Sequence, residues 1–286
     1  MKLLHNHRFF NILTNSLDIR HEIPARDIER FYAKALEFSA SARSLILSLM
    51  AVGFEVKRKA DKSFVTSADL RVEEYLRELI RRHFPDHGVI GEEFPPTNPG
   101  AAFQWILDPI DGTEDFVQHV PTFGSILALH YRGAPLVGVI DHPALSLCVS
   151  AALGLGMHKN GEHMILTDLD SAAIDGGERV MLPARANFIK YRDDGALFDA
   201  AVRAHPNHRI YRSCYAHSLA VIGAADATVD YANAIWDFAA SRILIEEAGG
   251  KFMIVREWDA PAAGRVYGSI MGKPSVVDRL ARIFNQ

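Results

Sequence analysis

The chain has 286 residues, of which 49% are hydrophobic and 23% charged, a composition typical of a globular protein with a sizeable core. Lysine and arginine number 31 against 35 aspartates and glutamates, and the net charge of −4 argues against nucleic acid as the main partner, because phosphate-backbone binders usually have a basic surplus. Cys148 and Cys214 lie far apart and outside any metal-ligand spacing, so we expect both to be reduced and buried.

Residues 1–23 form an N-terminal arm to which no chemistry can be assigned. This arm lacks the sustained apolar stretch and small-residue cleavage site of a secretory signal. No run approaches the roughly 18 consecutive apolar residues that cross a bilayer. We therefore expect a cytoplasmic protein without a membrane partner.

Two amphipathic helices are predicted in the first third of the chain. From Pro24 to about Met50 the apolar residues recur three or four apart, and a proline is well placed at a helix start. Ser67 is a candidate N-cap for a second helix that continues to Ile80 and ends before Pro85.

Short apolar runs after Pro85 predict strands, and two later runs predict helices. The strands are expected at 89–90, 105–107, 125–131, 136–140 and 251–255, and the helices at 219–225 and 238–248. Gly133, Ala134 and Pro135 separate two of the strands and predict a hairpin. Helices and strands are mixed throughout, so the fold class is α/β or α+β, and periodicity does not give the strand order.

The most informative segment is the turn that follows the strand at 105–107. Asp108 and Asp111 stand three apart, with Pro109 between them and Gly112 after them, so the backbone is built to turn sharply. Such a turn can aim both carboxylates and the carbonyl of Ile110 at one point. Converging oxygens suit a hard cation such as magnesium.

A phosphate site is expected beside these oxygens. If a helix begins after Gly112, the backbone N–H groups of Gly112 and Thr113 lie at its positive end, where phosphate binds. The alternative is that Asp108 and Asp111 only form the turn and cap the helix.

Other acidic residues stand where elements begin or end. Glu92 and Glu93 follow the strand at 89–90, and two neighbouring ionised carboxylates are easier to keep together around a cation. Asp237 is either the N-cap of the helix at 238–248 or a further metal ligand. Asp69 and Thr66 stand at the start of an earlier helix, where capping is again the simple explanation.

Four segments together resemble the inositol monophosphatase superfamily of lithium-sensitive, magnesium-dependent phosphatases. They are DKSFVTSAD (61–69), GEE (91–93), WILDPIDGTEDF (105–116) and WDFAASRILIEEAGG (236–250). The resemblance spans roughly residues 59–255. It implies a layered α-β-α-β-α sandwich, commonly a homodimer, with two or three Mg²⁺ ions. The expected compact unit has one half at 24–145 with most metal ligands and another at 146–286 with Asp237 and the specificity residues.

The resemblance also implies roles for individual residues. The metal ligands would be Glu92, Asp108, the Ile110 carbonyl, Asp111 and Asp237. Thr113, Asp69 and Glu93 would orient or deprotonate the attacking water, and Gly112 and Thr113 would bind phosphate through their backbone N–H groups. Water would attack a small-molecule phosphate monoester directly, without a covalent phosphoenzyme.

The segment at 116–143 and the triplet at 214–216 are similar to the histidinol-phosphatase branch. Asp230 takes the place of an acidic residue that touches the substrate's hydroxyl or amine, seven residues before the last metal ligand. Arg212 and Ser213 replace a small glycine-containing pair beside the substrate. Glu114 and His119 also depart from the family pattern.

A histidinol-phosphate-like substrate is therefore the leading hypothesis. The alternatives are an inositol-1-monophosphatase or another sugar or nucleotide phosphatase of the superfamily. A remote alternative is a catalytically silent, metal-binding regulatory homologue.

Overall fold

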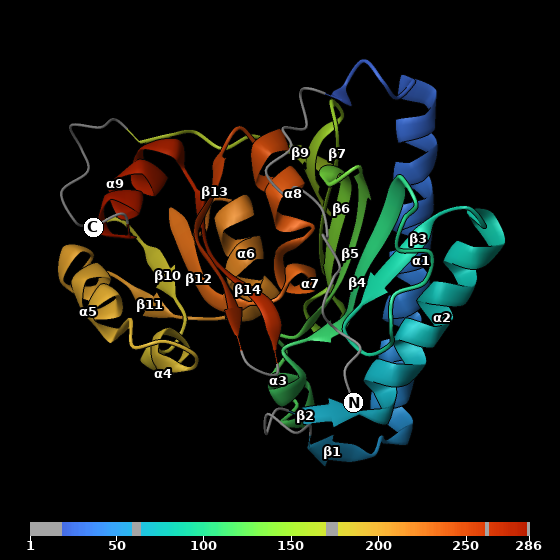
Figure 1. Ribbon diagram of the computed structural model, residues 1–286, viewed down its shortest axis with the longest axis horizontal. Coiled ribbons are helices and arrows are strands. Elements are labelled where there is room, and N and C mark those ends of the chain that lie inside the picture. The colour runs from blue at the N-terminus through green and yellow to red at the C-terminus, as the bar shows by residue number, and fades with distance from the viewer. Residues whose placement is uncertain (1–18, 59–63, 170–176, 261–262, 285–286) are drawn as a thin grey trace.

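The computed structural model describes residues 19–58, 64–169, 177–260 and 263–284, and within them two sheets alternate with three layers of helices (Figure 1). Helices α1 (Ala25–Val52) and α2 (Ser67–His83) cover one face of the first sheet. Between the sheets lie α6 (Ser213–Val221), α7 (Ile235–Phe238) and α8 (Ser241–Glu247). The far face of the second sheet is covered by α4 (Arg185–Ile189), α5 (Gly195–Ala204) and α9 (Pro274–Phe284). The predicted α-β-α-β-α sandwich is confirmed.

The first sheet has seven strands in the order β3-β4-β5-β6-β7-β8-β9. Their bounds are β3 Gly88–Gly91, β4 Phe103–Asp111, β5 Gly124–Tyr131, β6 Ala134–His142, β7 Leu147–Ala152, β8 Gly156–Lys159 and β9 Glu162–Met164. Strands β3 and β4 are parallel, whereas the following pairs are antiparallel. The predicted hairpin turns through Arg132 and Gly133, both at positive φ (48° and 87°), as a two-residue hairpin loop requires.

The second sheet has five strands in the order β11-β10-β12-β14-β13. Their bounds are β10 Val180–Leu182, β11 Arg209–Ile210, β12 Ala227–Asn233, β13 Lys251–Ala260 and β14 Gly264–Gly272. A separate pair, β1 (Val56–Arg58) and β2 (Phe64–Thr66), precedes α2, and a short helix, α3 (Thr113–Val117), follows β4.

Helix α1 is the one helix among the described residues that is long and apolar enough to span a membrane by length and composition. The sequence analysis considered only unbroken apolar runs, whereas this helix qualifies by its mean hydropathy over 18 residues. Its buried stripe, which includes Phe31, Phe38 and Ile46, packs on the seven-stranded sheet as a core helix does. Ile19 and Ile23, which the sequence placed in an arm, are buried in the same core. The rest of that arm, residues 1–18, lies outside the described residues.

Several element boundaries differ from the sequence prediction. Thr66, rather than Ser67, is the N-cap of α2. Helix α6 begins at Ser213 instead of Leu219, and the predicted helix at 238–248 is divided into α7 and α8. The predicted boundary between two halves after residue 145 falls between β6 and β7, which pair in one sheet. Cys214 is buried and Cys148 partly buried, and neither forms a disulfide.

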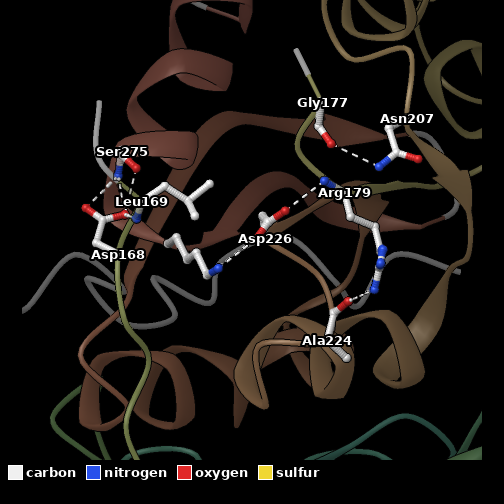
Figure 2. Close-up of polar contacts among 9 residues, drawn as sticks. Asp168, Leu169, Gly177, Arg179, Asn207, Ala224, Asp226 and Ser275 are labelled. Atoms are coloured by element: carbon white, nitrogen blue, oxygen red, sulfur yellow. Dashed lines mark hydrogen bonds and ion pairs between the residues drawn. The ribbon is translucent and has the colours of Figure 1, made fainter. Parts of the chain in front are cut away.

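A polar cluster fastens the chain at one end of the five-stranded sheet (Figure 2). The carboxylate of Asp226 accepts hydrogen bonds from the backbone N–H of Arg179 (2.8 Å) and from Nζ of Lys273 (2.7 Å). Asp168 accepts from the backbone N–H (3.2 Å) and Oγ (2.6 Å) of Ser275, and so caps the start of α9 from another segment. These contacts join Asp168 to the start of α9, and Arg179 and Lys273 to Asp226, the residue before β12.

Candidate active site

Two parallel strands of the first sheet end side by side at the candidate site. Gly91 of β3 pairs with Leu107 of β4, and the backbone N–H of Glu92 donates to the carbonyl of Leu107 at 3.3 Å. Glu92 therefore leaves its strand beside Asp108. This adjacency favours a shared metal site over two solvated loop glutamates.

Three carboxylates from distant parts of the chain converge at this point. One oxygen each of Asp108, Asp111 and Asp237 lies within 4.8 Å of the other two. Asp108 is only 1% exposed, and its Oδ1 has no hydrogen-bond partner among the residues that the structure describes. A buried, unpaired carboxylate oxygen among other acids is costly unless a cation binds it, so these residues fit a divalent metal ion.

The electrostatics of the cluster point the same way. Burial, and then the charges of Glu92, Asp111 and Asp237, raise the pKa of Asp108 well above its usual value. Burial, with Asp111 and Glu92, does the same to the pKa of Asp237. Burial also raises the pKa of Asp111, although the backbone N–H of Cys214 donates to its carboxylate and opposes the shift. A divalent cation would remove the mutual repulsion that keeps these groups from ionising together.

The turn after β4 has the shape that its sequence predicts. Pairing with β5 is interrupted between Asp108 and Asp111, and Gly112 adopts φ +81°, a left-handed conformation that suits glycine. Helix α3 begins at Thr113, so the N–H groups of Gly112 and Thr113 lie at its start. The carbonyl of Ile110 accepts a hydrogen bond from Oγ1 of Thr113 at 3.1 Å.

Asp69 combines a capping role with a place at the site. Its Oδ2 accepts hydrogen bonds from the backbone N–H (2.7 Å) and Oγ1 (2.6 Å) of Thr66, which closes a capping box at the start of α2. Its Oδ1 lies 3.4 Å from Oγ1 of Thr113. Burial raises the pKa of Asp69 to about 6, against the opposing hydrogen bonds from Thr66. The capping explanation is correct, and it does not exclude a catalytic role.

Sequence reasoning missed Glu73, which organises the loop that holds Glu92. Glu73 is fully buried, and its carboxylate accepts hydrogen bonds from the backbone N–H groups of Glu93 (2.8 Å) and Phe94 (3.2 Å). Nε of Arg77, one helical turn later, donates to it at 2.8 Å. The available signal was the position of Glu73 on the buried stripe of α2, four residues after Asp69 and four before Arg77.

A pocket of about 420 Å³ opens beside the carboxylates. Its lining includes the predicted residues Glu92, Asp111, Gly112, Thr113, Arg212, Ser213, Asp230 and Asp237. It also includes Glu114, which the sequence analysis had noted as a departure from the family pattern, and four residues that it did not single out for this role: Arg58, Phe64, Asn187 and Asn233. The predicted residues Asp69, Glu93, Asp108 and Ile110 are not part of the lining. Glu93 contributes to the site through its backbone N–H group, which donates a hydrogen bond to the carboxylate of Glu73.

Asp230 is held firmly at the pocket wall. Its Oδ2 lies 2.8 Å from Nε2 of His217 and accepts a hydrogen bond from the side chain of Asn233. Nδ1 of His217 lies 2.9 Å from Oγ of Ser241, so a buried chain of hydrogen bonds runs from the pocket into α8. Ser213, another lining residue, has φ +66°, a left-handed conformation that is uncommon for residues other than glycine.

Comparisons with known proteins agree with this fold. A model of the inositol monophosphatase family matches residues 27–282. The chain is 35% identical over 221 residues to a protein of Chlorobaculum parvum named histidinol-phosphatase, covering 76% of this chain and 82% of that protein. It is 27% identical over 207 residues to an Aquifex aeolicus protein named fructose-1,6-bisphosphatase/inositol-1-monophosphatase, with 71% and 76% covered. An IMPase structure from Thermotoga maritima is similar with a TM-score of 0.74 and 25% identity, covering 90% of this chain and 97% of that one.

The layered fold and acidic pocket define a metal-dependent phosphatase, a hydrolase of phosphoric monoesters. The chain belongs to the inositol monophosphatase family.

Proposed function

We propose that this phosphatase binds two or three Mg²⁺ ions and hydrolyses a small, histidinol-phosphate-like monoester by direct attack of water. The observation that supports magnesium most strongly is the cluster of Asp108, Asp111 and Asp237, in which Oδ1 of the buried Asp108 has no hydrogen-bond partner within the described part of the chain. An all-oxygen ligand set suits magnesium rather than zinc or copper. Glu92 and the Ile110 carbonyl would complete this set.

Bound magnesium would lower the pKa of a coordinated water and neutralise charge on the phosphoryl group and the leaving oxygen. The chain's own residues would do the rest. The N–H groups of Gly112 and Thr113 would hold the phosphate oxygens at the start of α3. Oγ1 of Thr113 would orient the attacking water by accepting a hydrogen bond from it, and would pass its own proton to Oδ1 of Asp69, 3.4 Å away. Asp69 would then be the base that takes up the proton, and Glu93 would assist.

The leaving group would lie against Asp230, Arg212 and Ser213. A carboxylate at the pocket wall suits a leaving group with an ammonium or hydroxyl donor. The 35% identity to a protein named histidinol-phosphatase supports an amino-alcohol phosphate over inositol phosphate, although the Aquifex relative's name keeps inositol and sugar phosphates as alternatives.

A panel of phosphomonoesters assayed with magnesium tests the substrate. We expect kcat/KM to be highest for histidinol phosphate. Because water attacks directly, we also expect the alcohol product and inorganic phosphate to form together, with no initial burst of alcohol and no phosphorylated enzyme. Turnover of inositol 1-phosphate with none of histidinol phosphate would overturn the substrate proposal and leave the phosphatase assignment intact.

We also propose a homodimer and a cytoplasmic location. The first is supported by family membership, and the second by the two free cysteines, Cys148 and Cys214, which suit a reducing compartment. Sedimentation of the purified chain would test the dimer, and fractionation of cells would test the location.

A further inference from the structure

Glu114 and Arg212 form an ion pair between two lining segments of the pocket. Nη2 of Arg212 donates to Oε2 of Glu114 at 2.8 Å. Glu114 belongs to the first turn of α3, directly after Thr113, whereas Arg212 is the residue before α6. Both side chains line the pocket and remain about half exposed, 57% and 46%, so the pair lies at the mouth rather than at the base.

This ion pair is expected to contribute little to the stability of the fold. Exposed ion pairs contribute little to stability because water screens them and ordering two long side chains costs entropy. Its position beside the phosphate-binding turn gives it another consequence. An uncompensated Glu114 carboxylate next to Gly112 and Thr113 would repel a phosphate group, and Arg212 cancels that charge.

Glu114 in turn neutralises the charge of Arg212. A guanidinium is the side chain best suited to bind a second phosphate, since it can offer two parallel N–H groups. Here Glu114 already engages Arg212 at the mouth, and Asp230 adds a further negative charge to the lining. On this side of the pocket, a second phosphate on the leaving group would therefore meet a neutral pair and a carboxylate. The other arginine of the lining, Arg58, belongs to a different segment, strand β1.

We propose that the Glu114–Arg212 pair makes the site selective for monophosphates over bisphosphates, by occupying the arginine that would otherwise bind a second phosphate. This inference rests on the proposed phosphatase activity and names the residues that would set its specificity. Relatives differ in this respect, because the name of the Aquifex protein includes a bisphosphatase activity, whereas that of the Chlorobaculum protein does not.

The test compares two ligands that differ only in the second phosphate, fructose 1-phosphate and fructose 1,6-bisphosphate. Each is measured as a competitive inhibitor against the best monoester substrate, so that neither has to be turned over. In the native protein we expect the bisphosphate to bind no more tightly than the monophosphate. In Glu114→Gln, which keeps the shape and removes the charge, the preference for the bisphosphate should rise about tenfold.

The double variant Glu114→Gln/Arg212→Ala separates two explanations for such a gain. If Arg212 binds the second phosphate, the gain disappears when the arginine is removed as well. If the gain only reflects lost repulsion from Glu114, it persists, and the inference is wrong. Lys251→Ala is a matched control, because the Lys251–Asp278 pair is similarly exposed (40% and 52%) and its residues do not line the pocket.

The remaining outcomes are also decisive. A native protein that releases phosphate, beside a Glu114→Gln variant with an unchanged bisphosphate preference, would refute the inference alone. A native protein that releases phosphate from no monoester would refute the proposed function, and the inference with it.

Discussion

The buried carboxylate of Glu73 accepts a hydrogen bond from the backbone N–H of Glu93 at 2.8 Å, and so joins helix α2 to the loop that carries Glu92. The same carboxylate lies close to the backbone of Gly91. A Cβ at that position would lie 2.1 Å from Oε1 of Glu73, so any other residue there would force Glu73 or the strand to move. The position of a proposed metal ligand thus depends on a helical residue that lines no part of the pocket.

Replacement of Glu73 should therefore weaken metal binding without removing a ligand. In Glu73→Ala we expect the affinity for Mn²⁺ or Mg²⁺, measured by calorimetry, to fall about 10- to 100-fold, the usual effect of losing a group that orients ligands. Glu74→Ala is the matched control, because Glu74 is 55% exposed and paired only loosely with Arg71 at 3.6 Å. Equal affinities in Glu73→Ala and the native protein, with both folded by circular dichroism, would contradict the assigned role.

Catalysis should depend on the hydroxyl group of Thr113 more than on the shape of its side chain. In Thr113→Val we expect kcat to fall about 100-fold or more, the effect of removing a group that orients or deprotonates the attacking nucleophile, with KM less affected. Thr113→Ser keeps the hydroxyl within reach of Asp69 and the Ile110 carbonyl and should retain most activity. Steady-state phosphate release measures both. A valine variant as active as the serine variant would exclude this role.

His130 should contribute to acid sensitivity, independently of the metal site. It is buried in β5, its Nε2 lies 3.0 Å from the carbonyl of Ala239, and burial lowers its pKa to about 4. A lowered pKa means that the stabilisation is present above the unfolded value, near 6.5, and is lost as the pH falls towards 4. We expect this residue to account for about 3 kcal/mol of the free energy of unfolding lost over that range.

Urea unfolding at several pH values measures this contribution. The variant His130→Gln, which can still donate to Ala239, should show a shallower loss of stability between pH 6.5 and 4 than the native protein. Parallel curves for the two proteins would show that His130 is not responsible.

The main chemical elements of the site could be predicted from the sequence because they are local. The turn from Asp108 to Thr113 contains its own proline and glycine, and the capping of α2 by Thr66 and Asp69 spans only four residues. The amphipathic stripe of α1 is likewise a property of one segment. Local patterns of this kind determine local structure largely regardless of what surrounds them.

Other features depend on contacts that the sequence does not display. A glutamate in a helix is ordinarily solvated, so Glu73 gives no sign that it binds a loop 20 residues further on. Asn187 reaches the pocket from α4, a helix of five residues with too few turns for a periodic pattern. Asp237 was ambiguous between a cap and a ligand. Its carboxylate in fact does accept from the backbone N–H of Ala234, and only the tertiary fold brings it to Asp108.

Anomalous X-ray scattering from crystals containing Mn²⁺ tests the metal assignment most directly. We expect a strong peak about 2.1–2.2 Å from carboxylate oxygens of Asp108, Asp111 and Asp237, and its loss in Asp108→Asn. A protein that hydrolyses phosphate monoesters with Mn²⁺ present, but has no metal peak among these three side chains, would contradict the account.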